Sequence, residues 1–113
     1  MKIKRISLLL MAVLTAKIGT IGYHDHRETW YDLPMTRVVE RADQYYGQKG
    51  EFAIREDGVK TYNGFVIVAT NWEKYPYGST VETTLGIGVV LDAHTAKNKN
   101  LVDVATAWKG GTE

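Results

Sequence analysis

The sequence contains no cysteine among its 113 residues. A disulfide framework, a thiol nucleophile and a zinc site built from thiolates are therefore excluded. The chain also lacks a strong excess of charge of either sign, because its formal net charge is +1. We therefore expect no broad basic face and no nucleic-acid partner. There is no internal repeat, low-complexity tract or linker, so the length corresponds to one small domain.

The apolar run near the N-terminus is too short to span a bilayer, which takes about 20 residues in a helix. Lys2, Lys4 and Arg5 precede this run at residues 6–14, and the small residues Thr15 and Ala16 follow it. That order is typical of a secretory signal peptide. We expect residues 1–16 to direct export and no stable membrane span to remain after processing. The alternative is a buried N-terminal helix or strand.

Histidine is scarce, since the chain has three in all. The cluster His24-Asp25-His26 contains possible metal ligands, but a structural metal usually takes four ligands and a catalytic zinc takes three from the protein. His94 is the remaining histidine, and there is no HExxH helix to set ligand geometry. We therefore expect no metal and no cofactor, and we interpret residues 17–31 as an irregular lead-in with a polar loop.

One helix is expected at about residues 35–46. Asp32 is a candidate cap, Pro34 suits the first turn, and Gly47 provides the stop. Apolar residues recur at helical spacing and define one buried face: Met35, Val38, Val39, Ala42 and Tyr45 or Tyr46. The helix is expected to pack on a sheet.

Beyond Gly50 the pattern changes to the period of strands. Asp57-Gly58 and Asn63-Gly64 are hairpin signals. The run at residues 65–69 is apolar throughout, which is typical of a strand covered on both faces. We expect six short strands, at residues 51–55, 59–62, 65–69, 80–84, 87–91 and 101–108. Many short strands with glycine-rich joints favour a closed barrel or a sandwich, and Gly86 and Gly88 permit the sharp bending of a small barrel.

Two aspartates interrupt the last two apolar runs. Asp92 ends the run at residues 86–92, and Asp103 lies eleven residues later within the run at 101–108. A carboxylate in an apolar strand is costly to bury unless it is paired, hydrogen-bonded or placed in a cleft. Any chemistry of this chain is therefore expected here.

Four elements over residues 65–108 resemble the three-aspartate (3D) domain, a double-psi β-barrel of small secreted bacterial cell-wall proteins that is distantly similar to membrane-bound lytic transglycosylase A. They are the strand Val66-Ile67-Val68-Ala69, the turn and strand at 75–81, the Gly-x-Gly strand at 86–92 and the strand Val102-Asp103-Val104. The resemblance implies a six-stranded double-psi barrel at residues 51–113, after a lead-in and helix at 17–50. It also implies a protein that is secreted or associated with the bacterial cell wall.

The chain departs from the family pattern at two places. The family's first aspartate has no counterpart, since Thr70 and Asn71 stand in that region, and the Asp-Thr-Gly-Gly that follows the Gly-x-Gly strand is replaced by residues 92–95, Asp-Ala-His-Thr. Two of the three aspartates remain. The loop between them is the part that differs most.

The resemblance implies peptidoglycan, or another wall glycan, as the partner. In a lytic transglycosylase an acid protonates the glycosidic oxygen, and the sugar's own 6-hydroxyl then closes an anhydro ring; Asp92 and Asp103 are the candidate catalytic pair. Trp72, Tyr75, Tyr77 and His94 are candidate substrate-binding residues, because aromatic faces stack on sugar rings. The alternative interpretations are a non-catalytic glycan-binding module and a structural barrel in which the two carboxylates accept backbone hydrogen bonds.

Overall fold

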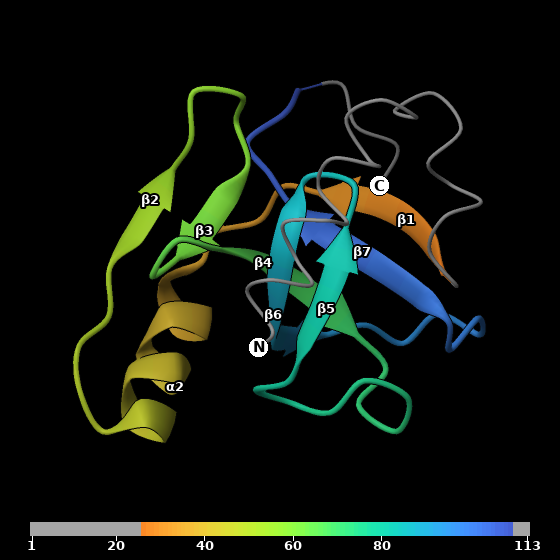
Figure 1. Ribbon diagram of the computed structural model, residues 1–113, viewed down its shortest axis with the longest axis horizontal. Coiled ribbons are helices and arrows are strands. Elements are labelled where there is room, and N and C mark those ends of the chain that lie inside the picture. Colours follow the sequence, from red (N-terminus) through yellow and green to blue (C-terminus); the bar gives the residue numbers. More distant parts are fainter. Residues whose placement is uncertain (1–25, 110–113) are drawn as a thin grey trace.

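The computed structural model describes residues 26–109 and shows a mainly-β protein with one helix (Figure 1). Seven strands form one mixed sheet that curls strongly into a half-barrel, and the helix lies beside it (Figure 1). The elements are β1 (Arg27–Tyr31), α2 (Thr36–Tyr46), β2 (Phe52–Ile54), β3 (Lys60–Tyr62), β4 (Phe65–Thr70), β5 (Thr80–Thr83), β6 (Gly86–Ala93) and β7 (Leu101–Ala105). The expected signal peptide, residues 1–16, lies outside the described residues.

Strand β4 is the branch point of the sheet because it pairs with three strands. Strand β6 runs parallel to it from Val66 to Thr70. On its other edge β4 pairs antiparallel first with β3 and then, at Val68 and Ala69, with β7. Strand β1 continues the sheet beyond β7 in parallel, while β2 and β5 are antiparallel partners of β3 and β6.

The predicted helix is confirmed, and its start is organised differently from the prediction. Met35 is the N-cap and makes no capping hydrogen bond through its side chain. Asp32, the expected cap, instead accepts a hydrogen bond from the Lys60 ammonium at 2.8 Å. Because Lys60 is buried, the pairing satisfies a charge that would otherwise be costly. Gly47 ends the helix at a φ of 75°, as predicted.

All six expected strands are present, with bounds that differ by up to three residues. The two predicted hairpin turns are confirmed as well. Gly58 has a φ of 89°, and Asn63 and Gly64 have φ values of 54° and 86°, the two consecutive positive values of a type I′ turn. Strand β4 is buried from Val66 to Thr70, as its unbroken apolar sequence predicted.

The expectation of an irregular segment was wrong for residues 27–31, which form the seventh strand. All five residues of β1 are in register with β7. Charged residues at its start hide the alternation, but Trp30 and Tyr31 face opposite sides of the sheet, as successive strand residues do. A short strand of this kind is formed by its pairing with β7 and not by local preference.

The sheet has a core on each face. The helix-side core joins the N-cap residue Met35, together with Val38 and Ala42 of α2, to Ile67 and Ala69 of β4. The opposite core contains six valines: Val59, Val66, Val68, Val90, Val102 and Val104. Strand β4 therefore contributes alternate residues to both cores, which makes its side chains central to the stability of the fold.

We expect Ile67→Ala to lower the free energy of unfolding by about 2–5 kcal/mol, because the side chain is fully buried and its loss leaves a cavity. Urea unfolding followed by circular dichroism measures the change. The matched control is Ile54→Ala, whose side chain is 52% exposed and whose loss should cost little. Equal losses in the two variants would contradict the central role of β4.

Candidate functional site

Asp92 and Asp103 flank the same residue of β4. The register of β4 with β6 sets Ala69 opposite Asp92, and the register of β4 with β7 sets Ala69 opposite Asp103. Neighbouring strands lie about 4.8 Å apart, so the two aspartate Cα atoms are separated by roughly 10 Å. Residues directly opposite each other project from the same face of a sheet. Both carboxylates therefore lie on the face of Ala69, which belongs to the helix-side core.

A β-bulge gives Asp92 this orientation. Val68 pairs with Val90, but the next residue, Ala69, pairs with Asp92, so Leu91 is an extra residue in β6. With regular pairing Leu91 would be opposite Ala69, and Asp92 would project from the other face. Bulges of this kind re-aim side chains next to functional sites.

Strand β1 supplies a hydrogen-bond donor to each aspartate. The Thr29 hydroxyl donates to Oδ1 of Asp103 at 2.7 Å, and the Tyr31 hydroxyl donates to Oδ2 of Asp92 at 2.8 Å. The Ala93 N–H donates to Oδ1 of Asp92 at 2.9 Å. We call Thr29, Tyr31, Asp92 and Asp103 the two-aspartate site. Thr29 and Tyr31 were not identified from the sequence. Their spacing of two residues, which places both side chains on one face of a strand, was the only pattern that pointed to them.

The charges of the site affect the pKa of Tyr31. Burial raises the pKa of its hydroxyl far above the usual value, and the neighbouring charges of Asp92 and Asp103 raise it further. One phenol is therefore influenced by both carboxylates. It keeps its proton at neutral pH and remains a hydrogen-bond donor to Asp92.

A surface groove with aromatic walls adjoins Asp92. It has a volume of about 380 Å³ and is lined by Arg41, Gln44, Tyr45, Trp72 and Tyr77. The Trp72 indole N–H donates to the backbone carbonyl of Asp92 at 2.9 Å, which places the groove beside that residue. We call it the aromatic groove.

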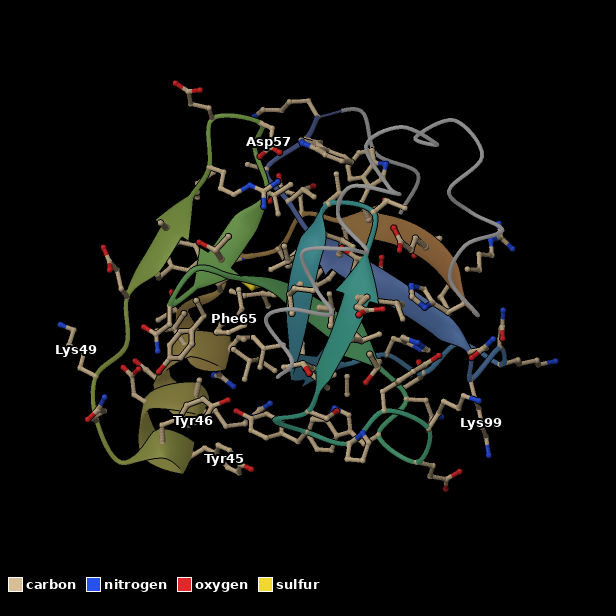
Figure 2. The ribbon with its side chains drawn as sticks, viewed as in Figure 1. Tyr45, Tyr46, Lys49, Asp57, Phe65 and Lys99 are labelled. Atoms are coloured by element: carbon tan, nitrogen blue, oxygen red, sulfur yellow. The ribbon has the colours of Figure 1, made fainter. Side chains whose placement is uncertain are left out.

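The rings of the aromatic groove contact one another in series. Trp72 and Tyr77 meet edge to face with centroids 5.3 Å apart, and Tyr77 meets Tyr45 in the same way at 4.9 Å. Figure 2 shows Tyr45 and Tyr46 at the end of α2, on the outside of the molecule. The hydroxyl of Tyr77 is buried and has no hydrogen-bond partner among the described residues.

The other two predicted substrate-binding residues lie elsewhere. Tyr75 packs against the opposite core, and its hydroxyl donates to Asn100 at 2.8 Å. His94 connects two parts of its loop: Nδ1 accepts the Ala96 N–H at 3.2 Å, so Nε2 carries the proton and donates to the Leu101 carbonyl at 2.8 Å. The structure thus brings Trp72 and Tyr77 to the groove and gives Tyr75 and His94 contacts within the fold.

Within residues 26–109, no three histidine, aspartate or glutamate side chains come together as metal ligands. His26 lies 2.9 Å from Glu28, while His24 and Asp25 are outside the described residues. In the same part of the chain, no helix has the length and apolar character to cross a membrane.

These features define a small mainly-β protein with a curled half-barrel sheet, one helix and a pair of aspartates on the helix side. In comparisons with known proteins, no family model, no curated protein and no solved structure matches the chain.

The raised pKa of Tyr31 predicts how the free energy of unfolding changes at alkaline pH. Below about pH 10, the usual pKa of tyrosine, the phenol is protonated in both folded and unfolded chains. Above it the unfolded chain loses this proton while the folded chain keeps it, so the free energy of unfolding falls as the pH rises. We expect Tyr31→Phe to reduce that decline by up to about 1.4 kcal/mol per pH unit. Urea unfolding between pH 8 and 11 measures it, and an unchanged slope would contradict the assignment.

Proposed function

We propose that this chain is an exported cell-wall protein that binds glycan strands of peptidoglycan in the aromatic groove and cleaves them at the two-aspartate site. The observation that carries the proposal is the position of Asp92. It shares a sheet face with Asp103 on the two sides of Ala69, and it adjoins the aromatic groove through Trp72. A sugar ring stacked on Trp72 would lie beside the backbone of Asp92, whose carboxyl group is the candidate acid.

The resemblance to three-aspartate domains supports the same function, and with it a double-psi barrel relationship. Strand β4 pairs with β3, β6 and β7, and the two aspartate-bearing strands are its neighbours. This agrees with a family in which the aspartates of separate strands act at one site. The proposal also includes export by residues 1–16.

The proposed reaction needs no water and no cofactor. This step requires Asp92 in its protonated form, which gives its carboxyl proton to the glycosidic oxygen as the bond from that oxygen to C1 breaks. The 6-hydroxyl oxygen of the same sugar bonds to C1, and its proton returns to Asp92, which leaves a 1,6-anhydro sugar. Asp103 contributes negative charge near the positive charge that develops at C1. Tyr31 and Thr29 hold the two carboxylates in position.

The second candidate function is glycan binding without cleavage. It is favoured by the absence of the family's first aspartate, at Thr70 and Asn71, and by the altered loop after Asp92. In the structure this loop is tied down by His94, whose backbone N–H also donates to the Thr70 carbonyl at 3.1 Å. The aromatic groove serves either function.

Cleavage is tested by incubating the purified protein with cell-wall sacculi and analysing the soluble products by mass spectrometry. We expect 1,6-anhydro-muropeptides from the wild type and at least about 100-fold less from Asp92→Asn, since general acid catalysis contributes that much or more. The control is Glu40→Gln, an exposed acid on α2, which should keep full activity. No product from a folded wild type, where a known transglycosylase releases it, would overturn the enzyme hypothesis.

Binding is tested by co-sedimentation with the same sacculi. We expect Trp72→Ala to weaken binding about tenfold because an aromatic face is lost from the groove. Phe65→Ala is the matched control, since Phe65 is 41% exposed against 40% for Trp72 and lies outside the groove. If the wild type cleaves nothing and Asp92→Asn still binds sacculi, the second candidate function, glycan binding without cleavage, is established. A wild type that neither sediments nor releases product would exclude both functions.

A further inference from the structure

A second pocket lies on the face of the sheet opposite the two-aspartate site. It has a volume of about 230 Å³, and its walls come from β1, from β7, from the turn between β5 and β6 and from the segment after β7. Thr29 of the two-aspartate site also lines it, and the residues that matter here are Glu28, Trp30, Thr84, Leu85, Val104 and Trp108. On β1, Glu28 and Trp30 alternate with Thr29 and Tyr31, so one strand serves the two sites with its two faces.

Two indole rings form a corner of this pocket. The centroids of Trp30 and Trp108 are 5.2 Å apart and the ring planes are inclined at 69°. The Trp108 indole N–H donates to the Asp57 carbonyl at 2.6 Å, which fixes the ring. Gly58 makes this approach possible, because a Cβ atom there would lie 2.7 Å from the Trp108 ring. The aromatic corner is therefore held by contacts outside the pocket.

Glu28 provides a negative charge at the pocket. Burial acts to raise the pKa of its carboxyl group, but hydrogen bonds from His26 and Thr84 outweigh burial and hold the pKa below its usual range. The Thr84 hydroxyl donates to it at 2.7 Å, the Thr84 N–H at 3.1 Å and His26 at 2.9 Å. The Thr84 N–H also lies 3.3 Å from the other carboxylate oxygen, so both oxygens are held by donors and the group offers a ligand its negative charge.

The remaining walls include the apolar side chains of Leu85 and Val104, and no lysine or arginine among residues 26–109 lines the pocket. We propose that the pocket binds an alkylammonium group at the end of a methylene chain, as in a lysine-type side chain. The indole faces attract the cation, Glu28 supplies the opposite charge, and Leu85 and Val104 contact the methylenes. The volume equals that of about seven or eight water molecules, which accommodates a four-carbon amine.

This site does not depend on the glycan hypothesis, because it lies on the other face of the sheet and shares no side chain with the aromatic groove. The indole N–H signals of the three tryptophans test it in ¹⁵N-labelled full-length protein. The probe is Nα-acetyl-lysine amide, and the matched control ligand is Nα-acetyl-norleucine amide, which has the same four-carbon chain without the ammonium group. We expect saturable shifts at Trp30 and Trp108 with the lysine derivative, none at Trp72, and at least tenfold weaker binding of the norleucine derivative.

Two variants separate the contributions of charge and ring. Glu28→Gln should raise the dissociation constant about tenfold, and Trp30→Leu should do the same with Trp108 as the remaining reporter. Glu82→Gln, an acid on β5 outside the pocket, should leave binding unchanged. If Glu28→Gln fails to fold, the two ligands and Trp30→Leu still decide the question. Equal affinity for the lysine and norleucine derivatives, or no saturable shift at Trp30 and Trp108, would overturn the proposal.

Discussion

The structure depends on the pairing of β4 with three strands. Its residues alternate between the helix-side core and the opposite core, and its two edges hold β6 on one side and β3 and β7 on the other. A strand buried on both faces needs a continuous apolar sequence, which residues 65–69 provide. Because β6 and β7 carry Asp92 and Asp103, the same pairing that builds the core also brings the two carboxylates to either side of Ala69.

Strand β1 connects the two candidate sites. Thr29 and Tyr31 donate to the aspartates on one face, while Glu28 and Trp30 line the second pocket on the other. The parallel pairing of β1 with β7 fixes the positions of both pairs of residues. A change in that register by one residue would exchange the two faces and dismantle both sites, so the register constrains β1 more than its sequence composition does.

The candidate site was predictable in part. An acid in an apolar run is conspicuous, so Asp92 and Asp103 could be identified from their surroundings, and Trp72 and Tyr77 from the aromatic character of their loop. The loop sequence did not distinguish Tyr75 from Tyr77, because the side of the chain on which each ring packs depends on the backbone path after β4. Arg41 and Tyr31 join the sites from distant segments, and no local pattern connects them with Asp92.

Local chemistry by itself determined the helix, its end at Gly47, the two hairpin turns and the six strands, because glycine and asparagine at positive φ and apolar spacing act over a few residues. Only the tertiary structure decided the seventh strand, the curl into a half-barrel and the bulge at Leu91. These depend on which strands become neighbours and in what register, a free energy that is shared among segments as far apart as Thr29 and Asp103. The sequence shows that the two acids are costly to bury, and the fold decides which donors stabilise them.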